Sequence, residues 1–344
     1  MILWLDGFDA YGVTANAAPA PAGIMARKYS AIASESSFKV RAGRYSGYAL
    51  NLPYDTFYFG KTGLTTEDTV IAGFAINFVS LRWPSYQFFG LYAGATRGVW
   101  LRRTTNGLEI EVMLGGGVIA TTSGVNFTAG VWQYLEIKVK CDSSAGTVDI
   151  QSNGSSVLSA SSLNTKAGSN SYHDGFRHYG IDVNLPMIDD FYFLDSSGAA
   201  NNDFLGKQKI VTLFPDDVGD ANEWSGSSGA DHYTLVGENP TDNDTTYVES
   251  SESTKQELWK YSDSLDVGTI AGLKINTDCR VTDVTSFNLG TLIQSGATGV
   301  SDAGQTIGAT GFTTPYLISE QDPNTVAAWG ASGVNNAQFG VKVV

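Results

Sequence analysis

Pro186–Pro215 reads PMIDDFYFLDSSGAANNDFLGKQKIVTLFP, and this stretch decides how the rest of the chain is divided. Met187–Leu194 alternates like a β-strand and is rich in aromatic residues. Asp195–Asp203 is small, polar and glycine-containing, and Lys207–Phe214 alternates again before Pro215 stops it. A strand, a connector and a second strand predict that one β-domain closes here and another opens.

The composition agrees with a two-domain β-protein. The chain has 344 residues, which is longer than one hydrophobic core usually supports. An apolar fraction of 42% suffices for packed cores, and 39 glycines with only 16% charged residues favour sheets and turns over a helical bundle. We predict two antiparallel β-sandwiches: a first domain at 1–195, a linker at 196–204 and a second domain at 205–344.

Turn signals and alternation support the first sandwich. Trp132–Lys140 places alternate residues on two faces, and Asn106-Gly107 and Asn153-Gly154 are hairpin signals between strand-like runs. Many short strands joined by such turns are typical of a sandwich or barrel.

In the second half of the chain, the predicted strands are spaced less regularly. Asp216–Gly229 is predicted as a polar loop, and Ala337–Val344 as the closing strand. Gln256–Ser262 is favoured as a strand, although Thr254 and Glu257 would also suit a helix capping box. A short helix is predicted near Thr325–Trp329.

Charge and hydropathy limit the classes of partner. The net charge is −14: residues 1–195 carry 14 Lys and Arg against 16 Asp and Glu, and residues 196–344 carry 7 against 19. A negative surface repels phosphates, which argues against nucleic acid as a partner. The sequence contains no run of eighteen apolar residues, so no membrane span is predicted. The acids between Asp216 and Glu257 are interpreted as solvated loops, with a Ca²⁺ site or a docking surface for a basic partner as the alternatives.

The N-terminus and the reactive side chains suggest a protein made in the cytosol. MILWLDGFDAYG has no basic region before its apolar residues, so no signal peptide is predicted. Cys141 and Cys279 form no CxxC pair and are predicted to be reduced. His173 and His178 flank a polar turn without metal-ligand spacing, and we predict that both are exposed to solvent.

Four segments of the first half resemble the laminin-G-like branch of the concanavalin A-like lectin/glucanase superfamily: Trp132–Val139, Gly146–Ile150, Asn153-Gly154 and Ile188–Phe193. The resemblance implies a jelly-roll sandwich over about the first 195 residues. It leaves the function open, because this fold hosts lectins, hydrolases and spacers.

The resemblance suggests an enzymatic and a sugar-binding hypothesis. Retaining glucanases of the superfamily carry acidic residues along one strand, because two carboxylates must flank the scissile bond. Here Leu108–Met113 reads LEIEVM, so Glu109 and Glu111 share a face but Met113 stands where another acid is needed. We therefore predict no catalytic residues and no enzymatic activity. Aromatic side chains that could stack on sugar rings are Trp83, Tyr86, Trp100 and Tyr172, with Phe88 and Tyr179 as further candidates.

A structural cation is the only cofactor that the resemblance suggests. Jelly-roll members of the superfamily often hold one Ca²⁺ between the N-terminal segment and the last strand, through carboxylate and backbone oxygens. Asp6 and Asp9 follow the first predicted strand, and Asp189 and Asp190 belong to the last one. These four residues are the predicted calcium ligands.

Short pieces in one order resemble a two-domain family of tailed-bacteriophage virion proteins: Asn202–Gly206, Thr212–Pro215, Trp224, Asn239-Pro240, Asp244–Val248, Asp322-Pro323, Ala328-Trp329 and Val334–Val341. The resemblance implies a non-enzymatic structural component of the virion that is assembled in the host cytoplasm. Its partners would be other virion proteins and further copies of itself. The alternative is an adsorption module that binds glycans of the host surface.

Overall fold

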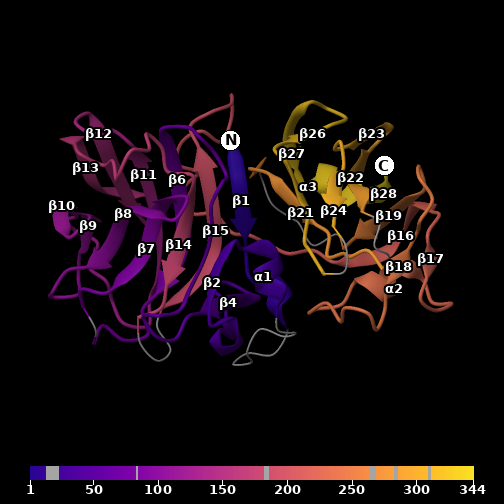
Figure 1. Ribbon diagram of the computed structural model, residues 1–344, viewed down its shortest axis with the longest axis horizontal. Helices are drawn as coiled ribbons and strands as arrows, with labels where there is room; N and C mark the ends of the chain where they lie inside the picture. Colours follow the sequence, from indigo (N-terminus) through magenta and orange to yellow (C-terminus); the bar gives the residue numbers. More distant parts are fainter. Residues whose placement is uncertain (13–22, 83, 182–185, 263–268, 283–285, 309–310) are drawn as a thin grey trace. The chain divides into compact units, whose positions relative to one another are not determined.

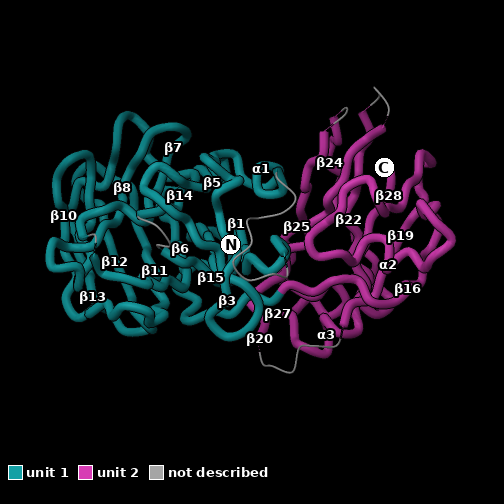
Figure 2. The backbone as a smooth tube through the Cα atoms, turned by 90° about the horizontal axis from the view of Figure 1, so that it is seen from below, with its two compact units in different colours: residues 1–211 teal, residues 212–344 magenta. Residues whose placement is uncertain are grey.

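The computed structural model describes residues 1–12, 23–82, 84–181, 186–262, 269–282, 286–308 and 311–344. They form two compact units, Met1–Val211 and Thr212–Val344 (Figure 2). The paired strands are antiparallel in both units, and the helices are short. The predicted all-β class with antiparallel sandwiches is confirmed. No helix among these residues is long and apolar enough to cross a membrane.

The first unit contains an eight-stranded sheet (Figure 1). Its spatial order is β13 (Ser155–Leu163), β12 (Gly146–Ser152), β11 (Trp132–Lys140), β6 (Thr69–Asn77), β15 (Met187–Asp195), β4 (Tyr48–Asn51) and β3 (Lys39–Ala42), with β1 (Ile2–Asp6) also paired to β15. The predicted turn Asn153-Gly154 joins β12 to β13 with both residues at positive φ, as a tight two-residue hairpin requires.

A seven-stranded sheet forms the second layer of this unit. Its order is β10 (Gly117–Thr121), β9 (Ile110–Leu114), β8 (Thr96–Arg103), β7 (Gln87–Ala93), β14 (Gly175–Tyr179), β5 (Tyr58–Lys61) and β2 (Ala31–Ala33). The short helices of the unit are η1 (Asp9–Tyr11), α1 (Ile24–Lys28) and η2 (Glu35–Ser37).

Aromatic side chains from the two sheets meet in a shared core. The ring centroids of Phe74 on β6 and Phe89 on β7 lie 5.0 Å apart, and those of Phe176 on β14 and Phe191 on β15 lie 4.4 Å apart. All four side chains are fully buried. Because inward residues alternate with outward ones along each strand, this core fixes which residues of the seven-stranded sheet face away from it.

The segment after β15 is a strap that crosses the first unit. We use the name strap for residues 203–211. Lys138 binds Asp203 at 3.1 Å, the Gly206 amide donates to Glu136 at 2.8 Å, and the Ile210 amide donates to Asp190 at 2.7 Å. The first unit therefore ends at Val211, later than the linker predicted at 196–204.

The predicted strand Lys207–Phe214 is wrong, because these residues pair with no strand. Their hydrogen-bonding groups meet side chains of the first unit instead: Arg44 donates to the Gln208 carbonyl, and Asp190 accepts from Ile210. Pro215 does not stop a strand but begins one, β16 (Pro215–Asn222), which also overturns the start of the loop predicted at Asp216–Gly229.

The second unit is built on a six-stranded sheet: β16, β19 (Gln256–Tyr261), β28 (Gln338–Val343), β22 (Phe287–Ser295) and β23 (Thr298–Ser301), with β24 (Gln305–Ile307) paired to β22. Smaller sheets pair β17 (Ser225–Gly226) with β18 (Val248–Glu249), β27 (Ala327–Gly330) with β20 (Thr269–Ile270) and β26 (Gln321–Asp322), and β21 (Leu273–Asn276) with β25 (Tyr316–Ser319). Its helices are α2 (His232–Val236) and α3 (Ala331–Asn336).

The core of the second unit centres on Trp329, Phe339 and Ile293, all buried. The strand favoured at Gln256–Ser262 is confirmed by β19. The helix predicted near Thr325–Trp329 is wrong, because Ala327–Gly330 forms β27 and the helix follows it.

Candidate functional site

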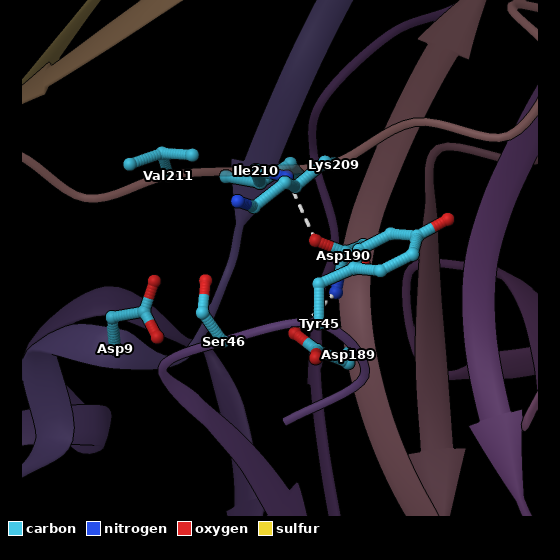
Figure 3. Close-up of a pocket in the computed structure, with 8 residues that line it drawn as sticks. All are labelled: Asp9, Tyr45, Ser46, Asp189, Asp190, Lys209, Ile210 and Val211. Carbon is cyan, nitrogen blue, oxygen red and sulfur yellow. Dashed lines mark hydrogen bonds between the residues drawn. The ribbon is translucent and has the colours of Figure 1, made fainter. Parts of the chain in front are cut away.

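Three of the four predicted calcium ligands gather at one small cavity. Its volume is about 30 Å³, and Figure 3 shows its lining: Asp9, Tyr45, Ser46, Asp189, Asp190, Lys209, Ile210 and Val211. Asp6 is not part of this lining. Its carboxylate accepts hydrogen bonds from the Phe8 amide at 2.9 Å and from the hydroxyls of Tyr11 and Tyr29 at 2.7 and 2.6 Å.

Protein donors already occupy much of this acidic cavity. Asp189 Oδ2 accepts from the Arg44 amide at 2.7 Å, and Asp190 Oδ2 lies 3.1 Å from Arg44 Nη2. Asp9 accepts from the Tyr48 amide at 2.7 Å. Burial, and then the charge of Asp190, raise the pKa of Asp189. Arg44 and Lys209 are thus cations that the structure places beside this pair.

Within the described ranges, no group of three or more His, Cys, Asp or Glu side chains has the arrangement of a metal site. Calcium at Asp9, Asp189 and Asp190 stays a prediction. Thermal unfolding with added Ca²⁺ and with EDTA would check it, because an ion bound only by the folded state raises Tm.

The predicted sugar-binding residues lie in different places. Trp83 lies outside the described residues. Tyr86 is exposed and comes just before β7, and Tyr172 is half-buried in the segment before β14. Trp100 lies on β8 with only 9% of its surface exposed, and its indole N–H donates to the Gly115 carbonyl at 3.2 Å. Phe88 is fully buried in the core.

The outward side of the seven-stranded sheet carries a cluster that we call the arginine face. The register pairs Trp100 with Gly90 and Gly90 with Arg177, so one row crosses β8, β7 and β14. The same side of the sheet holds the residues of the arginine face: Tyr58, Gln87, Tyr92, Arg97, Trp100, Arg102, Arg177 and Tyr179.

Aromatic rings hold the arginines of this face. The guanidinium carbon of Arg177 lies 4.1 Å from the ring centroid of Tyr92 and 5.0 Å from that of Tyr58. The guanidinium carbon of Arg97 lies 4.7 Å from the Trp100 centroid. Such cation–π contacts orient a guanidinium without neutralising its charge.

Two glycines allow the side chains of Arg177 and Gln87 to lie flat on the sheet. A Cβ at Gly60 would come within 2.5 Å of Arg177 Cγ, and one at Gly90 within 2.8 Å of Gln87 Nε2. Each glycine sits beside Arg177 in the strand register. Any larger residue at these positions would displace the side chain above it.

Two donors on the arginine face lack a protein acceptor. Gln87 Nε2 and Arg177 Nε are both buried, and neither donates to a protein atom. Tyr92 and Tyr179 share a short hydroxyl–hydroxyl hydrogen bond, and burial together with this bond raises the pKa of Tyr179. The face is therefore a preformed set of donors, two of them unsatisfied.

The two glutamates of LEIEVM do not face an open site as a pair. Glu109 lies before β9 and accepts from Thr122 Oγ1 at 2.7 Å and from the Gly124 amide at 2.8 Å. Glu111 on β9 binds Arg102 at 2.6 Å. Glu109 therefore anchors a loop, while Glu111 neutralises one arginine of the face.

The predicted exposure of both histidines is wrong. His178 is 0% exposed because Gly175–Tyr179 is a strand and not a turn. His173 precedes this strand and is 1% exposed, with its ring packed against Gly98 of β8. Alternation in this short segment places Phe176 and His178 in the core, and Arg177 and Tyr179 outward. The same alternation was the signal that would have identified Arg177, which sequence reasoning missed. Both cysteines are free, with Cys141 buried.

No protein-family model matches the chain. No curated protein matches it either.

Solved structures do match, at low similarity. The alginate lyase Aly36B is 11% identical, with a TM-score of 0.37, over 54% of this chain and 95% of its own. An endo-β-1,4-glucuronan lyase from the fungus Trichoderma reesei is 13% identical, with a TM-score of 0.37, over 53% and 94%. The cellulose-induced protein Cip1 is 13% identical, with a TM-score of 0.35, over 46% and 85%.

These matches correct one prediction. The expectation that the chain is not an enzyme is contradicted, because β-sandwich proteins similar to it include two lyases. The fold thus gives no ground for excluding catalysis. At these identities and TM-scores the likeness assigns neither a reaction nor a catalytic residue to this chain.

Proposed function

We propose that the first unit binds carbohydrate on the arginine face. The observation that carries this proposal is the exposed guanidinium of Arg97, held over the Trp100 ring and hydrogen-bonded to Gln87, on the same face as the half-buried Arg177. A guanidinium has five N–H donors and no acceptor, so the face favours a ligand with many acceptor oxygens. Hydroxyl-rich sugars supply such oxygens.

The construction of the face supports a ligand that lies along the sheet. Gln87, Arg177 and the ring of Tyr92 lie flat because Gly60 and Gly90 give them room. Arg97 is exposed and its Nη1 donates to Gln87 Oε1 at 2.7 Å, so the amide that carries one unsatisfied donor is held in place. Preorganised donors lower the entropic cost of binding.

The resemblance to tailed-phage virion proteins gives this binding a biological setting. In that setting the chain is a virion component and the carbohydrate is a glycan of the host surface. This part of the proposal rests on the sequence resemblance alone. Detection of the chain in purified virions by mass spectrometry would test it separately from glycan binding.

The binding proposal is tested with the full chain and a panel of neutral and acidic polysaccharides, by affinity electrophoresis and calorimetry. We expect at least one polysaccharide to bind, and the double substitution Gln87→Ala with Tyr179→Phe to weaken that binding at least tenfold. The matched control is Tyr247→Phe with Gln256→Ala, two exposed residues of the second unit. Equal affinity in the two variants, or no binding to any polysaccharide, contradicts the proposal. Released oligosaccharides are measured in the same samples, so that cleavage is detected where it occurs.

A further inference from the structure

Three of the four aromatic rings of the arginine face, those of Tyr58, Tyr92 and Trp100, are covered by arginines and are not free as stacking platforms. Arg97 covers Trp100, and Arg177 lies between Tyr58 and Tyr92. Trp100 and Tyr92 are only 9% and 4% exposed. A neutral sugar is usually recognised by an uncovered ring, whereas here the rings present guanidinium groups.

The charges of this face are unbalanced. Arg102 is paired with Glu111 at 2.6 Å. Arg97 donates to a neutral amide, and Arg177 contacts neutral tyrosines. Neither Arg97 nor Arg177 has a carboxylate partner among the residues that the structure describes. In a chain of net charge −14, two such arginines on one sheet face form a local positive site.

The spacing of the two arginines suits a repeating anion. Arg177 is on β14 and Arg97 on β8, with β7 between them. Two strand spacings separate the two strands, about 10 Å in the plane of the sheet. A polymer with an acidic group on its sugar units can reach both guanidiniums at once, and a guanidinium binds a planar carboxylate through two parallel hydrogen bonds.

We propose that the arginine face selects an acidic polysaccharide, with anionic groups bound by Arg97 and Arg177. This inference rests on the proposed carbohydrate binding and names the class of sugar. Carboxylate and sulfate groups share the chemistry that arginine recognises, so the ligand is a polyuronate or a sulfated glycan.

The test compares four polymers with the full chain by calorimetry: a polyuronate, its carboxyl-reduced neutral form, dextran sulfate and dextran. We expect the polyuronate or the dextran sulfate to bind, and the matching neutral polymer to bind at least tenfold more weakly. The variant Arg97→Gln with Arg177→Gln should lose at least tenfold in affinity and most of the salt dependence. The control Lys260→Gln with Arg280→Gln removes two positive charges from the second unit and should change affinity less than twofold.

The outcomes separate this inference from the proposed function. Binding of neutral and acidic polymers with equal affinity overturns the acidic class and leaves carbohydrate binding intact. No binding to any polymer overturns both. Equal binding of single-stranded DNA shows unselective attraction and overturns the inference. If the double variant fails to fold, Arg97→Gln alone gives the answer, because that side chain is exposed.

Discussion

His178 is a titratable residue that is fully buried in the aromatic core of the first unit. Its ring lies 5.1 Å from Phe59, 4.9 Å from Phe74 and 4.7 Å from Phe191, measured between centroids. Neither ring nitrogen has a hydrogen-bond partner. Burial lowers the pKa of His178 to about 3, from an ordinary value of 6.5, because the aromatic core cannot solvate a charge.

This burial predicts an acid-sensitive fold. Below pH 6.5, His178 binds a proton in the unfolded chain, whereas in the folded chain it stays neutral down to about pH 3. The free energy of unfolding therefore falls as the pH falls. The slope for one such group is at most about 1.4 kcal/mol per pH unit. His173, whose pKa burial lowers to about 4, adds to the slope over a narrower range.

The prediction is checked with His178→Phe in urea unfolding between pH 4 and 7. In the variant, the free energy of unfolding should depend less steeply on pH, by up to the contribution of one bound proton, whatever its stability at pH 7. His232→Gln, in the second unit, is the control. It should leave the pH dependence of the free energy of unfolding of the first unit unchanged. An unaltered slope in the His178 variant would show that this imidazole does not titrate as described.

At the scale of elements, β6, β11, β15 and the strap form one hydrogen-bonded unit on the outward side of the eight-stranded sheet. Glu136 on β11 is 1% exposed and accepts from the Tyr192 hydroxyl and from the Gly206 amide. The ring of Tyr192 lies over Gly73 of β6, where a Cβ would approach it to 2.3 Å. Burial raises the pKa of Glu136, and these donors act against that shift.

Removing one donor should therefore destabilise the first unit. We expect Tyr192→Phe to lower the free energy of unfolding of the first unit by about 1–3 kcal/mol, because a buried carboxylate oxygen loses one of its two donors. Tyr54→Phe is the control, since Tyr54 is 47% exposed. Urea unfolding at pH 7 measures both. Equal stability of the two variants would mean that the hydroxyl contributes nothing to holding Glu136.

At the scale of the whole molecule, we expect the strap to stabilise the first unit. Residues 203–211 donate hydrogen bonds to two buried carboxylates, Glu136 on β11 and Asp190 on β15, and Asp203 pairs with Lys138. A fragment of residues 1–211 should fold, whereas a fragment of residues 1–202 should be less stable by several hydrogen bonds of about 1 kcal/mol each. Thermal unfolding of both fragments checks this. Matching Tm values would show that the strap is dispensable and would move the boundary back toward the predicted linker.

Local patterns explain what the sequence alone determined. The all-β class, the strand Trp132–Lys140 and the turn at Asn153-Gly154 follow from alternation and turn chemistry within a few residues. Lys207–Phe214 alternates as well, yet forms no ladder, because side chains of the first unit satisfy its backbone first. Alternation in a sequence therefore predicts an extended backbone, but it does not predict which strand that backbone pairs with.

Only the tertiary structure decided the site. Arg97 and Arg177 are eighty residues apart in the chain and share a face because β7 pairs with both β8 and β14. His178 is buried for the same reason, since β14 turns its other side to the core. Register between distant strands is set by the summed packing of the whole sandwich, and no local stretch of sequence contains it.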